Sequence, residues 1–292
     1  MISPVQLKAL YLQACEVELQ AFKPGNVSVY ADGHGMTLAD FRISAEVSST
    51  PLCNPGYCLG EKIFYAVKAT REAVGCNTNL GIILLCAPLI QAISQKNVNV
   101  TMREALHQVL STTTIADADW VFKAITLASP GGLGSSDQQD VNNKAAVSLT
   151  EAMALAAAKD RIALQYVTDY RDILDFSVSL YYNALSRWGD QNWAAVAVYV
   201  NFLCLNPDSH IERKYGNQYS EVVADKMMLV SKALSDTDHP DSILPLLYCI
   251  DQDLKAINVN PGTTADITVA TVFAVFLEDF IESSNEFVKT NK

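Results

Sequence analysis

The chain has 292 residues, of which half are hydrophobic and 18% are charged, and its formal net charge is −11. This hydrophobic fraction excludes disorder for most of the chain and is sufficient to bury a large core. The acidic balance argues against a nucleic-acid-binding protein, because phosphate contacts need a basic face. An anionic small substrate remains compatible with the charge, provided that a local cationic patch or a metal ion holds it.

Seven cysteines are scattered along the chain without a C-x-x-C pair, which argues against a disulfide framework and a zinc site. Several stand in apolar runs, as free cysteines in a reducing compartment do. The first twenty residues lack the basic start and long apolar run of a signal peptide. The longest apolar stretches, near 82–90 and 193–205, are too short to span a membrane. We therefore expect a cytoplasmic protein that uses no membrane span.

Helical periodicity extends over nearly the whole chain. The 13 glycines and 10 prolines are clustered, and between the clusters apolar residues recur at 3.6-residue spacing. One short run, Asn97–Met102, is strand-like instead. Without a linker or a fixed-period repeat, the pattern predicts a single all-α domain over residues 1–292, with a central polar cleft. The predicted helices span 4–22, 37–48, 58–74, 78–95, 101–110, 115–128, 144–160, 165–187, 191–205, 218–234, 240–257 and 261–287.

Several helix starts are marked by capping residues. Asn260 and Asn206 each precede a proline, which predicts Asn at the N-cap and Pro at the first helical position. Thr37 is followed by Asp40 three residues later, a pattern typical of a reciprocal N-terminal cap.

Five polar segments interrupt the apolar helices, and they span 23–36, 75–81, 129–140, 208–216 and 260–268. Connections of this kind carry function disproportionately. Each segment also has an ordinary structural interpretation as a turn, a helix cap, a surface loop or a salt-bridged solvated face. If the chain is an enzyme, the loops at 23–36, 129–140 and 260–268 are expected to converge on one cleft, whereas in a non-catalytic scaffold they are expected to lie apart.

The first two segments contain candidates for binding anions. A lysine, a histidine and an aspartate within a dozen loop residues suit phosphates, hydroxyls or a metal. Asn77 or Thr78 can cap the apolar helix behind them, whose free N–H groups would form an anion site. The candidates of the first segment are Lys23, Asn26, Asp32 and His34.

The other three segments contain carboxylates and cations. Asp137 and Asp140 would share one face of a helix, a geometry that suits Mg²⁺, and Asp208 is a third candidate ligand. The cationic group His210, Arg213 and Lys214 suits phosphates. The last segment opens the final helix with the polar residues Asn260, Thr263 and Thr264, and its Asp266 is either a metal ligand, a general base or a surface charge.

Four short motifs occur in a characteristic order. They are Lys-Pro-Gly-x-Val from Lys23, Gly-His-x-Met from Gly33, Gly-x-Asn-Thr from Gly75 and Pro-Gly-x-x-Ala-Asp from Pro261. Together they resemble the triphosphoribosyl-dephospho-coenzyme A synthase family. The resemblance implies an all-helical fold and a reaction in which the ribose 2′-hydroxyl of dephospho-coenzyme A attacks the anomeric carbon of ATP and displaces adenine. The positions that match the motifs are Lys23, His34, Asn77, Thr78, Gly262 and Asp266.

The chain departs from the family pattern in three places. Ser28 stands where an aspartate is usual, Asn79-Leu80 replaces His-Lys, and Thr263-Thr264 replaces Gly-Ser. Loss of a histidine and a lysine beside an expected phosphate site argues for a changed substrate.

The leading hypothesis is an Mg²⁺-dependent transferase that uses ATP or another phosphate- or diphosphate-bearing substrate in cofactor or prosthetic-group biosynthesis. We assign Asp32, His34 and Asp266 to catalysis, and the other candidates to the substrate or the metal. The first alternative is a divergent member that joins a diphosphate-activated small molecule to an acceptor in the biosynthesis of a one-carbon-carrying cofactor. A hydrolase and a non-catalytic helical binding protein are further alternatives. The sequence leaves open whether the chain is a monomer or a homodimer.

Overall fold

The computed structural model describes residues 2–96, 100–130 and 140–290, with side chains described up to residue 283. Over these residues the chain is helical, and the two isolated β-bridges, Ser28–Ala31 and Gly33–Met36, belong to no sheet. The prediction of an all-α fold is confirmed. The elements are α1 (Pro4–Gln20), α2 (Leu38–Leu52), α3 (Leu59–Val74), α4 (Leu80–Gln95), α5 (Met102–Ser111), α6 (Ile115–Ala128), α7 (Leu149–Ala156), α8 (Arg161–Val167), η1 (Asp172–Ser177), α9 (Val178–Trp188), α10 (Gln191–Leu205), α11 (Ser209–Tyr215), η2 (Gly216–Tyr219), α12 (Ser220–Ser235), η3 (Pro240–Ile243), α13 (Leu244–Ala256) and α14 (Gly262–Thr290).

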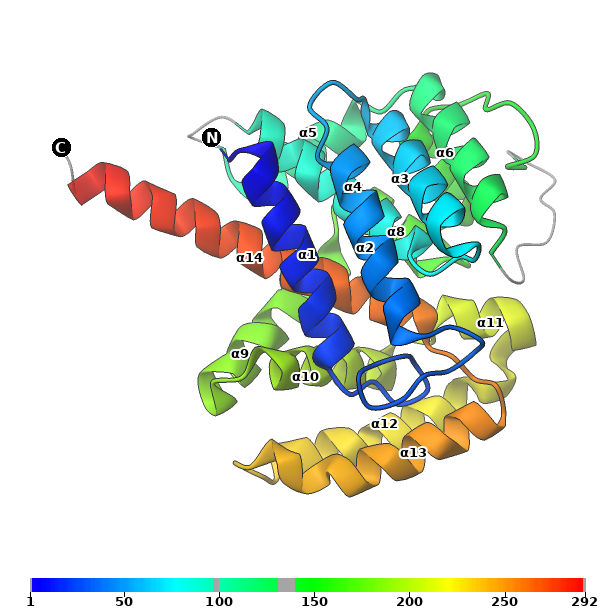
Figure 1. Ribbon diagram of the computed structural model, residues 1–292, viewed down its shortest axis with the longest axis vertical. Helices are drawn as coiled ribbons and strands as arrows, with labels where there is room; N and C mark the ends of the chain where they lie inside the picture. The colour runs from blue at the N-terminus through cyan, green and yellow to red at the C-terminus, as the bar shows by residue number, and fades with distance from the viewer. Residues whose placement is uncertain (1, 97–99, 131–139, 291–292) are drawn as a thin grey trace.

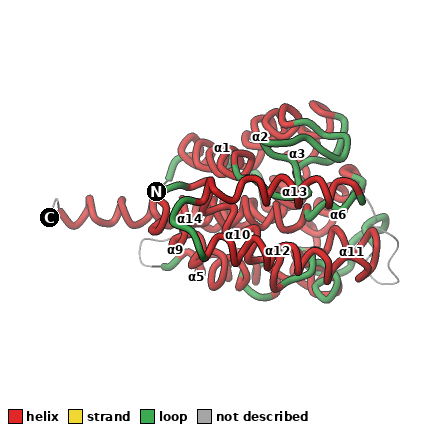
Figure 2. Tube along the Cα trace, turned by 90° about the horizontal axis from the view of Figure 1, so that it is seen from below, coloured by secondary structure: helices red, strands yellow, loops and turns green. Residues whose placement is uncertain are grey.

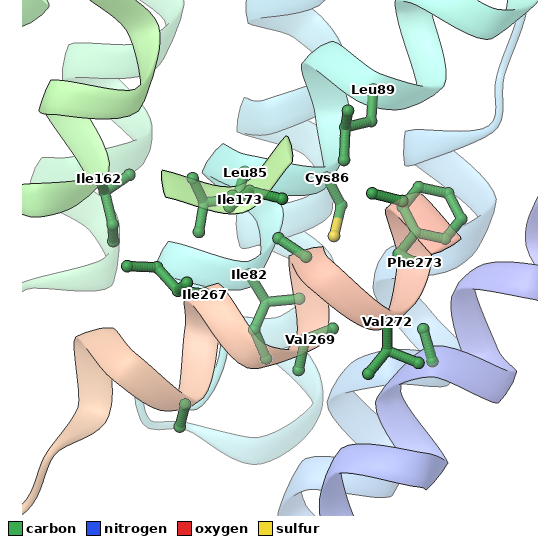
Figure 3. Packing of buried hydrophobic residues seen from close by; sticks show 14 of the residues in the cluster. Ile82, Leu85, Cys86, Leu89, Ile162, Ile173, Ile267, Val269, Val272 and Phe273 are labelled. Atoms are coloured by element: carbon green, nitrogen blue, oxygen red, sulfur yellow. The ribbon is translucent and has the colours of Figure 1, made fainter. Parts of the chain in front are cut away.

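Two helices that are apolar on most sides form the centre of the molecule. Helix α4 is buried continuously over 80–90, and α14 is buried over most of 263–277. A helix without a polar face has no side to turn to water and must be surrounded by other elements. Ile82 and Cys86 of α4 pack beside Ile267 and Val269 of α14 (Figure 3). The starts of both helices lie on the same side of this core, and that arrangement positions the site.

The remaining helices surround this pair. Helices α2, α3 and α6 pack together on one side, and α9, α10, α12 and α13 lie on the other (Figure 1). Helix α1 contacts α2 of the first group and α10 of the second, and so joins the two groups. The C-terminal end of α14 projects beyond the body in both views (Figures 1 and 2).

Two predicted helices differ from the structure. The predicted helix over 144–160 is reduced to the eight residues of α7. The predicted helix over 165–187 is interrupted after Val167, because Asp169 and Tyr170 adopt positive φ angles of 50° and 59° and the chain continues as the π-helical turn η1. The Tyr170 hydroxyl donates to the Leu85 carbonyl across 2.9 Å, so a buried tertiary hydrogen bond accompanies the break.

The prediction of a strand at 97–102 is also wrong for the residues that the structure describes. Residues 97–99 lie outside the described residues. Thr101 instead caps α5 reciprocally with Glu104, and Met102 is the first residue of that helix. The alternation of side chains was too short to outweigh a strong capping signal.

The predicted helix starts are confirmed in part. Thr37 and Asp40 form the reciprocal cap of α2. Asn206 instead ends α10, and the N-cap of α11 is Asp208, so the prediction at Asn206 is wrong by two residues. The side chain of Asn260 does not cap α14 but accepts a 2.7 Å hydrogen bond from Asn26. In the part of the chain that the structure describes, no helix combines the length and the apolar character needed to cross a membrane.

Candidate functional site

A cavity of about 240 Å³ lies where the starts of α4 and α14 meet. Each of the five polar segments contributes at least one described residue to its lining, the arrangement expected of an enzyme, and segment 129–140 does so through Pro130 because 131–139 lie outside the described residues. Apolar side chains from α2, α4, α6, α7 and α8 complete the wall. The residues contributed by the five segments are Asn26; Asn77, Thr78, Asn79, Leu80 and Gly81; Pro130; His210 and Arg213; and Gly262, Thr263, Ala265 and Asp266.

Asp266 is the most unusual group in the cavity. Its carboxylate makes no hydrogen bond with any described residue, although burial and the neighbouring carboxylates Glu18 and Asp208 raise the pKa of Asp266 well above its ordinary value. Arg213 acts in the opposite direction, but more weakly. Asp266 is only partly exposed, and a polar group largely shielded from water without a partner costs free energy, so its retention calls for an explanation.

Gly81 allows Asp266 to lie against the first turn of α4. A Cβ atom at residue 81 would come within 1.9 Å of Asp266 Oδ2 and 2.7 Å of Ile162 Cδ1, so a larger residue would displace the carboxylate. The amides of Gly81 and Ile82, in that first turn, have no acceptor among the described residues. Unpaired N–H groups at a helix start favour a negative charge beside them.

Serines of α2 hold the loop that enters α4. The Thr78 hydroxyl donates to Ser44 Oγ across 2.6 Å. The side-chain Nδ2 of Asn79 donates to the Ser44 carbonyl and to Ser48 Oγ. The Asn77 side chain accepts from the Leu80 amide at 3.1 Å and thereby takes up one free N–H group of the helix. The N-cap position itself is Asn79, so Asn77 satisfies a helix amide from two residues upstream, whereas Thr78 bonds to α2.

Among the described residues that line the cavity, Arg213 provides the positively charged side chain. One guanidinium nitrogen donates to Asp160, whose other carboxylate oxygen caps α8. The Arg213 Nε atom is buried without a hydrogen-bond partner in the described structure. Asp160 therefore orients the guanidinium while leaving part of its donor capacity unused.

Glu18 and Lys23 form a buried ion pair beside the cavity. Lys23 Nζ lies 3.2 Å from Glu18 Oε1, with the side chains 0% and 5% exposed. The same nitrogen donates to the carbonyls of Glu18 and Val27 at 2.8 and 2.9 Å. Lys23 does not line the cavity, whereas Glu18 does. The geometry therefore gives Lys23 the role of closing its own loop and does not support the predicted contact with a phosphate.

The two histidines of the predicted site are uncharged at neutral pH. His210 lines the cavity, and burial together with Arg213 and Lys214 lowers its pKa to about 4. His34 lies outside the lining, and burial also lowers its pKa, while its Nε2 contacts the Gly25 carbonyl at 2.8 Å. Neither imidazole supplies the positive charge that was predicted for phosphates.

Asp208 connects two helix starts. One carboxylate oxygen accepts the amides of His210 and Ile211, and the other accepts the amide and hydroxyl of Thr264, all within 3.1 Å. Both oxygens are thus occupied, so Asp208 does not fit the predicted metal ligand. Thr264 is committed to the same network, and Thr263 lines the cavity.

The other predicted residues lie outside the cavity lining. Asp32 is exposed and accepts from the Leu38 amide at the start of α2, and Lys214 is exposed on α11. Asp140 accepts the amide and side chain of Asn142 in a local turn. Asp137 lies outside the described residues. The prediction that these aspartates, His34 and Lys214 share a cavity with Asn77 and Asp266 is therefore not supported for the described members.

Glu18 and Asp160 were missed as cavity residues. Both look ordinary in the sequence, because Glu18 stands inside an amphipathic helix and Asp160 precedes a helix as a cap. The one available signal was that Glu18 breaks an otherwise apolar helical face, five residues before a lysine.

The depressed pKa of His210 predicts a pH-dependent stability. Between about pH 6.5 and pH 4 the unfolded chain binds a proton at this residue and the folded chain does not, so the free energy of unfolding should fall as the pH falls through this range. Up to about 3 kcal/mol is involved. Comparing urea unfolding of wild type and His210→Asn at pH 7 and pH 4.5 isolates this contribution. An identical pH dependence in both proteins would show that the imidazole is accessible to protons in the folded state.

The fold and the cavity define an all-helical protein with a polar site built on helix starts. The model of the ATP:dephospho-CoA triphosphoribosyl transferase family matches residues 4–285, and the chain belongs to this family of transferases. None of the curated proteins compared with the chain matches it. A crystal structure from Archaeoglobus fulgidus, assigned as a triphosphoribosyl-dephospho-coA synthase, shares 22% sequence identity with a TM-score of 0.62, covering 80% of this chain and 97% of that one. At this identity the similarity shows a common fold.

Proposed function

We propose that the chain transfers an activated group from a phosphate-bearing donor, ATP in the first instance, to a hydroxyl of an acceptor such as dephospho-coenzyme A. Family membership supports the reaction class. The single observation that carries the proposal is the carboxylate of Asp266, which lines the cavity without a hydrogen bond from any described residue and has a raised pKa. A carboxyl group with a raised pKa and no competing partner is a candidate for proton transfer.

In the proposed reaction the acceptor oxygen bonds to the anomeric carbon of the donor. The bond from that carbon to the adenine nitrogen breaks, and adenine leaves with the electron pair. The acceptor proton passes to Asp266, which lies at the cavity wall and has no competing partner among the described residues. The triphosphate stays on the transferred ribose, so the site must hold phosphates throughout the reaction.

Two groups support the phosphates in this proposal. The amides of Gly81 and Ile82 open the buried helix α4, and a helix start attracts anions through its N–H groups and its dipole. Arg213 adds charge-assisted donors, one of which, Nε, has no partner in the described structure. Both lie in the lining of the same cavity as Asp266.

Magnesium is part of the proposal. Among the described residues no three histidine, cysteine, aspartate or glutamate side chains are grouped to hold a metal, so an all-protein cage does not fit. Mg²⁺ commonly uses one or two carboxylates plus substrate phosphate oxygens. Glu18 fits as that carboxylate because it lines the cavity beside Asp266. A bound Mg²⁺ would neutralise phosphate charge in a strongly acidic protein.

One observation favours a second candidate function. Asn79 and Leu80, which replace a His-Lys pair usual in the family, both line the cavity. Arg213 is then the basic side chain among the described lining residues, and three carboxylates, Glu18, Asp160 and Asp266, stand near it. A site with so few cations suits a donor that carries fewer charges than a triphosphate. The second candidate is therefore the joining of a diphosphate-activated small molecule to an acceptor, with pyrophosphate as the leaving group, as in the biosynthesis of a one-carbon carrier.

One assay separates the two candidates. The purified protein is incubated with ATP and dephospho-coenzyme A, and free adenine and pyrophosphate are measured, with Mg²⁺ and with excess chelator. Release of adenine that depends on the acceptor and on Mg²⁺ is expected. Release of pyrophosphate without adenine would favour the second candidate. Adenine release that continues unchanged in chelator would contradict the metal requirement, and release without an acceptor would indicate a hydrolase.

A further inference from the structure

A second, larger hollow lies on the surface next to the cavity. It is an open groove of about 640 Å³ between α3, α6 and the segment 141–144, on the side of the molecule where α3 and α6 pack together (Figure 1). None of the candidate site residues discussed above lines it. We call it the α3–α6 groove.

Basic side chains gather in the α3–α6 groove although the chain is acidic. Four basic residues, Lys68, Arg71, Lys123 and Lys144, and two acidic residues line it, against 21 basic and 32 acidic residues in the whole chain. Arg71 forms no ion pair within the described residues and is only partly exposed. A local excess of cations on a protein of charge −11 is the feature that an anionic ligand needs.

The two acidic residues offset this charge incompletely. Glu72 approaches Lys68 at 3.8 Å, and both side chains are about half exposed or more, so the pair is weak. Asp119 Oδ1 accepts the amide of Ala145 across 2.8 Å and so holds the segment that forms one wall. The positive charge of Arg71 and Lys144 is therefore available to a ligand.

The groove also has an aromatic wall. Phe64 and Phe122 line it, and Phe64 packs against Trp120 behind it with ring centroids 5.0 Å apart. Lys123 also lines the groove, and its Nζ lies 4.5 Å from the centroid of the Trp120 ring. An apolar face bordered by cations fits a ligand that has both an apolar part and phosphates.

The α3–α6 groove lies next to the cavity that contains Asp266. Val141 lines both, and on α6 Ile125 lines the cavity while Thr126 and Leu127 line the groove. Helix α3, which carries Arg71, leads directly into the loop that places Asn77 and Thr78 in the cavity. A two-part ligand can therefore extend from one into the other.

We infer that the α3–α6 groove binds the phosphate-bearing, non-reacting part of the acceptor substrate, whose hydroxyl enters the cavity. The ligand class is an elongated molecule with a diphosphate and an apolar arm, as dephospho-coenzyme A has. Arg71 and Lys123 contact the diphosphate, and the arm lies on Phe64. The inference rests on the proposed function for the identity of the reacting hydroxyl, but the groove and its charge stand independently.

Calorimetric binding of dephospho-coenzyme A and, separately, of ATP tests the inference on wild type, Arg71→Gln and Arg71→Gln/Lys123→Gln. The matched control is Lys232→Gln, because Lys232 likewise stands in the last turn of a helix and interacts with the helix dipole, but lies on α12. Loss of one charged phosphate contact weakens binding by about 10- to 100-fold. We expect that loss for dephospho-coenzyme A in Arg71→Gln and a larger one in the double variant, with ATP binding and the control unchanged.

Three outcomes would overturn the inference: equal affinity of all variants for dephospho-coenzyme A, no binding of it to wild type, or a loss confined to ATP. Turnover separates this result from the proposed function. If the enzyme is active, Arg71→Gln should raise KM for the acceptor and leave kcat unchanged. If wild type binds dephospho-coenzyme A through Arg71 but releases neither adenine nor pyrophosphate, the groove is supported and the proposed reaction fails.

Discussion

Replacement of Asp266 by asparagine is expected to lower kcat by about 10²- to 10⁴-fold, the usual contribution of a positioned general base. Asparagine has nearly the same shape but cannot accept the proton of the acceptor hydroxyl. The cavity should be preserved, because the carboxylate makes no hydrogen bond with described residues that the amide would lose. Steady-state rates of adenine release measure the effect.

The same substitution should leave stability at pH 7 unchanged or raise it. The pKa of Asp266 is raised in the folded state, so the unfolded chain releases this proton at a lower pH than the folded chain does. Ionisation therefore destabilises the fold as the pH rises above the ordinary pKa of an aspartate, and asparagine removes that cost. A fold that loses stability together with activity would point to a structural role instead.

A matched control for the activity loss is Asp253→Asn. Asp253 is an exposed aspartate whose carboxylate pairs with Lys226, so its loss should leave kcat unchanged. Because a base must be deprotonated to act, wild-type kcat/KM should rise with pH through a pKa above the ordinary carboxyl range. Full activity of Asp266→Asn in the presence of saturating substrates would remove Asp266 from the chemistry.

The fold was predictable because helical periodicity and capping residues act locally. The reciprocal caps of α2 and α5 and the apolar character of α4 and α14 are all encoded within one or two turns of the chain. The break at Asp169–Tyr170 was not predictable in this way. The break accompanies a hydrogen bond from Tyr170 to Leu85 of α4, more than eighty residues away in the sequence. A contact over this distance cannot be predicted from a local sequence pattern.

The site was predictable at the level of segments but not of all side chains. Five polar interruptions of an apolar chain each contribute to one cavity, which lies at the starts of the buried helices α4 and α14. Within those segments, a carboxylate that caps a helix and one that faces a cavity have the same sequence appearance. Asp208 and Asp266 illustrate this, since the first has both oxygens occupied by two helix starts and the second has no hydrogen bond from a described residue.

The sequence also does not distinguish a lysine that stabilises the fold from one that binds phosphate, and Lys23 provides the clearest test of this distinction. Lys23→Met is expected to lower the free energy of unfolding by about 3–5 kcal/mol, because it leaves the carboxylate of Glu18 buried without its partner. Two buried carbonyl acceptors, of Glu18 and Val27, also lose their donor. Urea or thermal unfolding measures the change, and Lys8→Met, at an exposed pair with Glu46, should cost no more than about 1 kcal/mol.

The double variant Glu18→Gln/Lys23→Met distinguishes a structural lysine from one that binds phosphate. Removing both charges eliminates the uncompensated carboxylate, so we expect the double variant to recover part of the stability that Lys23→Met loses. It also keeps the test informative if the single variant fails to fold. A lysine that served mainly to bind phosphate would give the opposite pattern, with little change in stability and a raised KM for ATP in Lys23→Met. The complete enclosure of Lys23 Nζ, which is occupied by Glu18 and its own loop, makes loss of stability the expected result.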